Sequence, residues 1–429
     1  MLLSSPRLVL TAEMLSLLLS LVVLGRCGAF TNIASRRETI ANQHIIAMRA
    51  IFSANRRSFV GSSIAATTLF TPPRLPKSAL AADILPKGGS PKIVLWGYGN
   101  QNKLMAKYLH ERKYPVVAVV AHKNIGEDYG MVESDWGNIG TQTGVIIISE
   151  DEAPTTLETL KADVCIMCTC STIQDLQPAL TVCANAKVNV ITIAEELLNS
   201  WTSSPKITKE MDALFKSNGV SLTGSGFIDG ACCEMALTMS SMMHRMDALE
   251  GSLQYNVDDY GKVLAIAHGV GLTKAQFQRD IIQKPQAKSY VYNTNEWFVS
   301  AFGLTLLKTT EVREPTFSKN ELQSVALKKT IPAGDCTGMK VIATTTTKEG
   351  ICFVAEQIGK CYDEGDEDFC SWGFLGEPSG VRFTIQSPPT PQMTNTATIS
   401  RISQIIAAEP GYVTTDRLAI ARYEHFSSA

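Results

Sequence analysis

The stretch IVLWGYGNQN, at residues 93–102, decides how the rest of the chain is interpreted. Four apolar residues predict a buried strand, and a G-x-G sequence follows directly before a segment of helical character. The first glycine, Gly97, allows a tight turn, and the second, Gly99, lets the backbone approach a pyrophosphate at the helix N-terminus. The stretch therefore predicts the first strand, turn and helix of a dinucleotide-binding fold.

Strand-like and helix-like segments alternate from this point to about residue 245. Because the strands are continuously apolar and helices separate them, we expect a parallel sheet with helices on both faces. After Asp229 we expect helices at 230–246, 273–283, 296–308 and 394–408, and strands at 252–257, 322–330, 338–347, 350–358 and 379–386. Strands without interleaved helices indicate a mixed or antiparallel sheet. The predicted fold is α/β, a Rossmann-type doubly wound parallel sheet followed by a second α+β domain.

These changes in pattern predict four parts of the chain. Residues 1–82 form a targeting presequence, and 83–228 form the dinucleotide-binding Rossmann domain. Residues 229–392 form an α+β domain for substrate and oligomer contacts, and 393–429 form a C-terminal helix and tail that return to the Rossmann domain.

The first 82 residues differ in composition from the rest. An apolar run at 14–24 is short enough for a secretory signal core, and residues 31–82 hold six Arg and six Ser but one acid. This order resembles the bipartite plastid presequence of algae with complex plastids. An Arg56-Arg57 pair before a mildly apolar run resembles an export signal for folded proteins, so the stroma and the thylakoid lumen both stay open. The secretory pathway is the alternative location.

Charge and composition exclude several classes of function. Residues 1–82 hold nine of the 39 basic residues and two of the 41 acidic ones, so the remainder is acidic, at about −9. An acidic surface does not attract nucleic acid, and no later segment is apolar enough to span a membrane. Cys165, Cys168 and Cys170 lie in an apolar strand without further ligands nearby, so we expect no metal site.

The cofactor site is predicted at the ends of two later strands and at the turn that joins the strand at 93–96 to the helix after it. The turn supplies Gly97, Tyr98, Gly99, Asn100, Gln101 and Asn102, although Asn102 stands where the dinucleotide fingerprint has a third glycine. The second strand ends at His122 and Lys123 rather than at an acid, which favours NADP(H) over NAD(H), unless Lys123 is only a turn residue. Thr169, Cys170 and Ser171 follow the strand at 163–168 and bring hydroxyl side chains to the same crevice, unless Ser171 or Thr172 only caps the next helix.

Candidate catalytic and substrate-binding residues follow later strands. Glu195 and Glu196 could bind an ammonium group or act as acid and base, or could favour a helix dipole as first-turn acids. Gly224, Ser225, Gly226 and Phe227 could offer backbone amides to a substrate carboxylate. His268 is the histidine of the second domain that we assign to catalysis.

These stretches together resemble the dihydrodipicolinate-reductase-like superfamily, especially its 2,4-diaminopentanoate dehydrogenase branch. The matching segments are IVLWGYGNQNKLMAKYL, ADVCIMCTCSTIQDLQPAL, NVITIAEELLNSW, TGSGFIDGACCEMAL, HGVGLTKAQF and PQMTNTATISRISQIIAAEPGYVTTD, between residues 92 and 417. The resemblance implies a Rossmann domain, an inserted α+β domain with oligomer contacts, and pyridine-nucleotide-dependent oxidoreduction at an amine or imine carbon. The reductases proper carry an adjacent His pair that this chain lacks, which argues against a role in lysine biosynthesis.

We therefore expect an NAD(P)H-dependent dehydrogenase or reductase that transfers hydride at the amine or imine carbon of a small amino acid or related metabolite. The expected partner is a small amine-bearing molecule, and the expected assembly is a homo-oligomer. Two alternatives stay open, namely a non-catalytic dinucleotide-binding sensor or scaffold in the plastid and a dehydrogenase that acts on a carbonyl or hydroxyl group.

Overall fold

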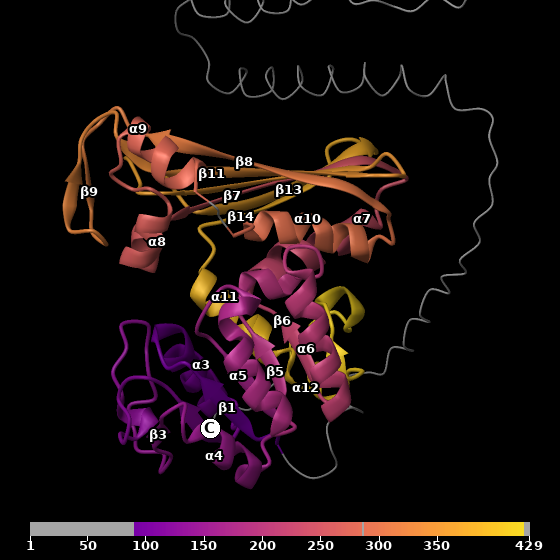
Figure 1. Cartoon of the computed structure of the whole chain (residues 1–429). Helices are drawn as coiled ribbons and strands as arrows, with labels where there is room; N and C mark the ends of the chain where they lie inside the picture. Colours follow the sequence, from indigo (N-terminus) through magenta and orange to yellow (C-terminus); the bar gives the residue numbers. More distant parts are fainter. Residues whose placement is uncertain (1–89, 285–286, 424–429) are drawn as a thin grey trace, which may run out of the picture. The chain divides into compact units, whose positions relative to one another are not determined.

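The computed structural model describes residues 90–284 and 287–423, which belong to one compact unit, Leu75–Ala429 (Figure 1). The predicted presequence at 1–82 lies outside the described residues. No helix in the described part of the chain is long and apolar enough to cross a membrane.

The first sheet has seven strands in the order β15-β6-β5-β4-β1-β2-β3, and all its pairs are parallel. Its strands are β1 Ile93–Trp96, β2 Val116–Val120, β3 Ile147–Ile148, β4 Val164–Met167, β5 Asn189–Thr192, β6 Ser221–Gly224 and β15 Gly411–Tyr412. The order reverses between β1 and β4, as in doubly wound dinucleotide-binding folds. The predicted Rossmann-type sheet is therefore confirmed.

Helices cover both faces of this sheet. On one face lie α4 Ala153–Leu160, α5 Ile173–Asn185 and α6 Pro205–Asn218, and on the other lie α3 Asn100–Glu111, α11 Thr390–Ile399 and α12 Ile402–Ile406. Apolar side chains of α12 pack with those of β1 and α3 in one core. The C-terminal segment thus returns to the first sheet, with two short helices where one was predicted at 394–408.

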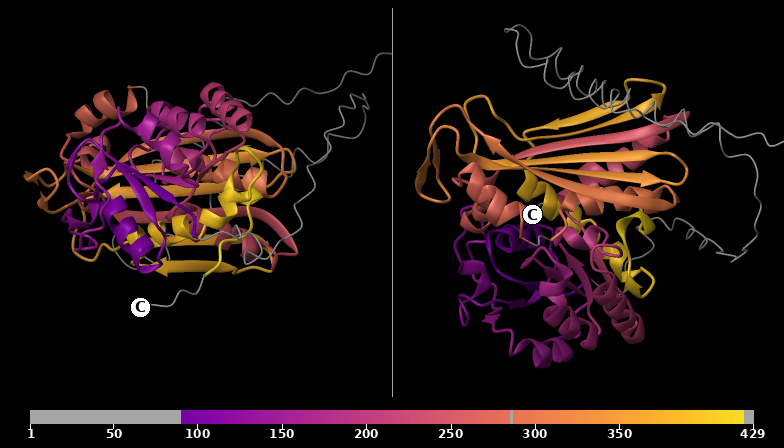
Figure 2. Two further views of the ribbon diagram at one scale, coloured as in Figure 1. Left: turned by 90° about the horizontal axis from the view of Figure 1, so that it is seen from below. Right: turned by 45° about the horizontal axis from the view of Figure 1, so that its top comes forward.

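The second sheet has six strands in the order β14-β13-β7-β12-β11-β8 (Figures 1 and 2). Its strands are β7 Arg245–Asn256, β8 Leu306–Phe317, β11 Cys336–Thr347, β12 Cys352–Lys360, β13 Phe369–Glu377 and β14 Arg382–Gln386. It is mixed, because β7 and β12 run parallel and the other neighbours run antiparallel. A separate hairpin joins β9 Leu322–Ser324 to β10 Lys329–Ile331. The predicted second α+β domain is confirmed.

Helix α10, Tyr290–Ala301, lies between the two sheets (Figure 1). Trp297 and Phe298 of α10 are fully buried in the core beneath the second sheet. The same helix contacts η4, Glu195–Leu198, which follows β5 of the first sheet. Helix α10 therefore connects the core of the second sheet to the carboxyl-terminal edge of the first.

Two predicted helices are wrong in extent. The helix expected at 230–246 consists of a π-helix, η5 Ile228–Glu234, and a short α-helix, α7 Met235–Ser240. The strand β7 then begins at Arg245. The helix expected at 296–308 corresponds to α10, and the strand β8 that follows it was not predicted. β8 is an edge strand with no fully buried residue, so its sequence lacks the apolar alternation that identifies a half-buried strand.

Candidate active site

The turn after β1 has the backbone geometry that a dinucleotide requires. Gly97 has φ +79°, and a Cβ there would lie 2.5 Å from Thr169 Cγ2 and 2.6 Å from the Cys168 carbonyl oxygen. Gly99 is the N-cap of α3, and a Cβ there would meet nothing within 4 Å. The first glycine thus permits close packing on β4, and the second borders open space in front of the helix amides. This arrangement fits a pyrophosphate.

Asn102, in the place of the third glycine, lies beneath the turn and is fully buried. Its side-chain amide donates hydrogen bonds to the carbonyl oxygens of Gly97, at 2.6 Å, and Trp96, at 3.1 Å. Asn102 therefore holds the end of β1 to the first turn of α3. Asn102 thus supports the turn from below and leaves the space above it open.

Three other residues of the turn make side-chain hydrogen bonds, and Asn100 Oδ1 accepts one from the Ser134 hydroxyl at 3.3 Å. The Tyr98 hydroxyl donates to the Tyr129 carbonyl at 2.8 Å, so this ring packs into the core. Gln101 donates to Asn395 Oδ1 at 2.6 Å and to the Pro391 carbonyl at 3.0 Å. Because Gln101 also lines the large cavity described below, the turn and that cavity adjoin.

His122 and Lys123 are exposed at the end of β2. His122 Nε2 lies 3.4 Å from Glu150 Oε1, which also accepts a hydrogen bond from Trp96 Nε1 at 3.1 Å. The fold thus brings an acid from the segment after β3 to this edge, which the order of the sequence did not indicate. Lys123 has no ion-pair partner among the described residues, so its charge is free at the position where a ribose would lie.

The segment after β4 lies at the same edge of the sheet. Thr169, Cys170 and Ser171 are all exposed. Thr172 is the N-cap of α5, where its hydroxyl accepts a hydrogen bond from Asp175 N at 3.2 Å. Thr172 therefore caps α5, Thr169 and Cys170 stay available to a ligand, and Ser171 interacts with Glu195.

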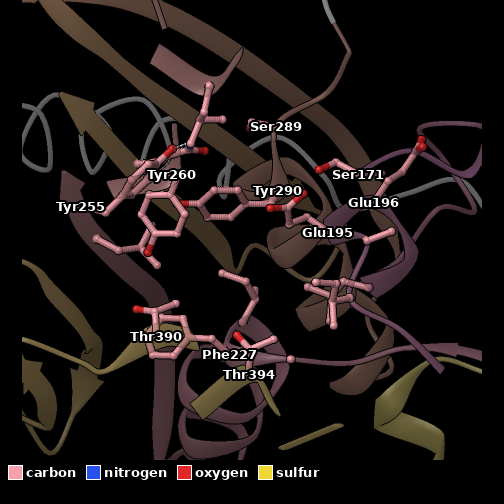
Figure 3. A pocket seen from close by; sticks show the side chains of 18 of the residues that line it. Ser171, Glu195, Glu196, Phe227, Tyr255, Tyr260, Ser289, Tyr290, Thr390 and Thr394 are labelled. Atoms are coloured by element: carbon pink, nitrogen blue, oxygen red, sulfur yellow. Dashed lines mark hydrogen bonds between the residues drawn. The ribbon is translucent and has the colours of Figure 1, made fainter. Parts of the chain in front are cut away.

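A cavity of about 480 Å³ opens between the carboxyl-terminal edge of the first sheet and the second sheet (Figure 3). Its walls are mostly apolar or aromatic. Among the lining residues are Trp136, Ser171, Glu195, Phe227, Leu253, Tyr255, Tyr260, Tyr290, Met339, Val341 and Thr394. Most small-molecule sites have this form, an apolar hollow with few polar groups.

The structure separates the two adjacent glutamates. Glu196 accepts hydrogen bonds from the hydroxyls of Ser203 and Ser204, at 2.7 and 2.6 Å, and from Ile173 N at 2.9 Å. These bonds tie α5 to the loop before α6, so Glu196 has a structural task. Both glutamates line the cavity, but Glu195 is the exposed one of the two.

Glu195 is accessible from the cavity although protein surrounds it. This burial raises the pKa of its carboxyl above the ordinary value, and a hydrogen bond from Ser171 acts in the opposite direction. A carboxyl with a raised pKa can exchange a proton nearer to neutral pH. Glu195 is therefore the residue best placed to act on a bound nitrogen.

The Gly224–Phe227 segment lines the cavity, but its amides are already bonded within the protein. Ser225 N donates to Thr192 O at 2.9 Å, Gly226 N to Asp229 Oδ1 at 2.6 Å, and Phe227 N to Thr394 Oγ1 at 3.3 Å. These three amides are therefore not free for a substrate carboxylate. The segment contributes the shape of the wall.

His268 lies at the end of α8, Lys262–Ala267, and is buried. Its Nδ1 is 2.9 Å from the Leu264 carbonyl oxygen, and its Nε2 is 2.8 Å from the Tyr255 hydroxyl. Both ring nitrogens are thus engaged by the protein, although His268 is itself among the residues that line the cavity.

Three tyrosines of the cavity were not predicted from the sequence. Tyr255 is on β7, Tyr260 ends η6, Val257–Tyr260, and Tyr290 begins α10. Figure 3 shows Tyr255 and Tyr260 together on one side of the cavity, with Tyr290 between them and Glu195. Nothing in their local sequence distinguishes them, because their proximity depends on the packing of α10 beneath the second sheet.

Comparisons with known proteins agree with this geometry. No protein-family profile matches the chain. A 2,4-diaminopentanoate dehydrogenase of Acetoanaerobium sticklandii is 25% identical over 196 residues, which cover 44% of this chain and 53% of the relative, so the match spans about half of that curated protein. The solved structure of an amine dehydrogenase from Mycobacterium smegmatis is 32% identical, with a TM-score of 0.72, and the match covers 79% of this chain and 98% of that one.

The chain belongs to the amine dehydrogenase family. The resemblance to the 2,4-diaminopentanoate dehydrogenase branch is thereby confirmed, and so is the expectation of an oxidoreductase family. The alignment covers nearly the whole M. smegmatis chain, so the two proteins share the fold with both sheets.

Proposed function

We propose that this protein is a nicotinamide-dinucleotide-dependent dehydrogenase that acts at the carbon–nitrogen bond of a small apolar amine. The proposal rests most directly on Glu195, a carboxyl that opens into an aromatic cavity beside the Gly97–Gly99 turn. When bound, the nicotinamide accepts or supplies the hydride, and the residues of the chain bind and orient the substrate.

Glu195 would bind the substrate nitrogen as an ammonium group and then take up its proton. A neutral amine is required before hydride can leave the adjacent carbon, and a carboxylate of raised pKa accepts such a proton readily. Ser171 lines the cavity together with Glu195, on the side of the first sheet. The aromatic and apolar walls of the cavity would exclude water from the reacting carbon.

The charges of the cavity favour an amine over an amino acid. Two cationic side chains line it, and each already makes a contact within the protein. Arg313 pairs with Glu311, and Lys288 lies over the Tyr292 ring, 4.8 Å from its centroid. The amides of Ser225, Gly226 and Phe227 are also engaged, so apart from Arg313 Nε, which has no hydrogen-bond partner, the cavity offers a carboxylate few donors. A substrate that is apolar apart from its nitrogen fits best.

We further propose that the cofactor is NADP(H) rather than NAD(H). Lys123 carries a free charge at the end of β2, whereas Glu150 at the same edge is engaged by Trp96 and His122. A 2′-phosphate is therefore supported by Lys123.

The test is turnover by the purified protein. A panel of apolar amines, the matching amino acids and the matching alcohols is offered with NADP⁺ and NAD⁺, and the reduced nicotinamide is followed by its absorbance. We expect turnover of amines only. Turnover of alcohols alone would favour the carbonyl or hydroxyl alternative, and binding of NADPH without any turnover would favour the dinucleotide sensor.

We also propose a plastid location and a homo-oligomeric assembly. The composition of residues 1–82 supports a plastid location, which a fluorescent protein fused behind these residues would report in an alga with complex plastids. Assembly into a homo-oligomer through the second domain rests on the family resemblance, and light scattering of the purified protein measures it.

A further inference from the structure

A long segment between β2 and β3 is attached to the start of α3. Residues 121–146 contain little regular structure besides η3, Tyr129–Met131, and long connections of this kind usually serve a function. The Ser134 hydroxyl donates a hydrogen bond to Asn100 Oδ1 at 3.3 Å. Asn100 directly follows Gly99, so the segment is attached at the helix terminus where a pyrophosphate would bind.

The part of this segment that carries Trp136 is folded on itself and on α3. Trp136 N donates to the Ser134 hydroxyl at 3.2 Å, and Gly137 N donates to the Ser134 carbonyl at 3.2 Å. Lys103 Nζ donates to the Glu133 carbonyl at 2.7 Å. These bonds place the backbone of Trp136 against the first turn of α3.

The Trp136 side chain is half-buried and lies outside the apolar cores. Among the described residues it joins none of the hydrophobic clusters, whereas Ile139, three residues later, packs in the core of the first sheet. Burial of apolar surface in the core therefore does not explain why this large ring stands here. Aromatic rings that face a cavity are typical of ligand sites.

Trp136 lines two cavities that share part of their walls. One is the large cavity of Glu195, where Gln101 of α3 is another lining residue. The other has a volume of about 210 Å³, and its remaining lining residues come from the second domain and the segment that leads to α11, namely Asp259, Tyr260, Asp368, Pro388, Pro389, Thr390 and Pro391. The residue therefore lies where the start of α3 faces the second domain, beside the entrance to the large cavity.

We propose that Trp136 is a cofactor-retaining residue, which packs on the bound dinucleotide between its pyrophosphate and its nicotinamide and slows its release. A dinucleotide with its pyrophosphate at Gly99 and its nicotinamide near Glu195 passes beside Trp136, which shares a cavity wall with Glu195. A large aromatic ring offers it an extensive apolar contact. The inference rests on the proposed function, since it concerns the cofactor of the same site.

The test measures how fast NADPH leaves the purified protein. An excess of NADP⁺ displaces bound NADPH, and the loss of nicotinamide fluorescence gives the dissociation rate. We expect Trp136→Ala to raise this rate roughly fivefold to twentyfold, because the contact of the indole is lost. Trp136→Phe keeps an aromatic ring and should restore much of the retention. Met131→Ala, at an exposed residue of the same segment, should leave the rate unchanged.

The attachment of the segment can be tested apart from the ring. Ser134→Ala removes the hydrogen bonds to Asn100 Oδ1 and Trp136 N, so we expect dissociation to become about twofold to fivefold faster. In a Trp136→Ala background the same change should have no further effect, because the segment then carries no ring to hold in place. An equal acceleration in that background would overturn the proposal.

The surroundings of the ring can be measured without rates. The emission of Trp136 is obtained as the difference between the unchanged protein and Trp136→Phe. We expect acrylamide to quench this emission less when NADP⁺ is bound, because the cofactor covers the ring. Unchanged quenching, or an unchanged dissociation rate in Trp136→Ala, would overturn the proposal. Retention of NADPH by Trp136 without turnover of any amine would support this inference and overturn the proposed function, whereas a protein that binds neither NADPH nor NADH would overturn both.

Discussion

Gly224, the last residue of β6, lies directly against the backbone of Leu197 in η4. A Cβ at Gly224 would lie 2.3 Å from the Leu197 carbonyl oxygen and 2.8 Å from Leu198 N. This contact sets the distance between β6 and the short helix that begins with Glu195. The position of the Glu195 carboxyl therefore depends on Gly224, because any larger residue there would push η4 away from β6.

We expect Gly224→Ala to displace Glu195 and to lower turnover by about two orders of magnitude, because small misplacement of a reacting group is costly. The overpacking should also reduce the free energy of unfolding by about 1–3 kcal/mol. Steady-state kinetics and thermal denaturation measure the two effects. NADPH affinity should stay unchanged, because the Gly97–Gly99 turn is elsewhere; loss of NADPH binding would mean that the whole fold is disturbed.

For Glu195→Gln we expect turnover to fall by roughly 10²–10⁴-fold, as for the loss of a general base. The melting temperature should not decrease, because the change replaces a carboxylate enclosed by protein with a neutral amide. In the unchanged protein, oxidation of the amine needs the ionised carboxylate. Its rate should therefore fall as the pH drops through a pKa above the ordinary glutamate value of 4.5. A pH–rate profile of kcat checks this, and full activity of Glu195→Gln would contradict the assigned role.

The choice of cofactor should depend on Lys123. The change Lys123→Glu places a negative charge where a 2′-phosphate would lie, so we expect the preference for NADPH over NADH to fall by about 10–100-fold. Dissociation constants from fluorescence titration give the ratio. Lys161→Glu, at the exposed C-cap of α4, is the control. An unchanged ratio in Lys123→Glu would show that Lys123 is only a turn residue.

A buried ionic cluster holds the C-terminal segment to the cavity wall. Arg401 is fully buried and pairs with Asp229, at 3.0 Å, and with Glu234. Because Arg401→Ala leaves two buried carboxylates without their partner, we expect the free energy of unfolding to fall by about 3–5 kcal/mol. Denaturant unfolding measures the change. Arg245→Ala, which removes only exposed pairs, should lower the stability far less, and an equal loss in both variants would contradict this account.

The sequence predicted the parts of the fold whose pattern is local. The apolar strands of the first sheet and the turn at Gly97 follow from short-range rules, and the structure confirms that sheet. The edge strand β8 could not be predicted, because an edge strand need not bury either face. The C-terminal helix was predicted as one element, yet Ser400 and Arg401 interrupt it between α11 and α12.

The candidate site was predictable only in part. The sequence indicated Glu195 and Glu196 equally, and their different surroundings follow from the direction of two neighbouring side chains in a short helix. Asn102 departs from the glycine pattern of the dinucleotide motif, and only the structure shows that its buried amide holds the turn. The partnership of His268 with Tyr255 depends on Gly359, which is distant in the chain, so no local pattern could indicate it.

The most direct measurement of the central claim is titration of the purified protein with NADPH and NADH, followed by fluorescence. We expect the unchanged protein to bind, and Gly99→Val to lose binding while keeping its melting temperature, because a Cβ at Gly99 meets no protein atom within 4 Å. Gly97→Ala, which would collide with Thr169 and the Cys168 carbonyl, should instead lower the melting temperature. If the folded, unchanged protein bound neither nucleotide, or if Gly99→Val bound as tightly as the unchanged protein, the account would be contradicted.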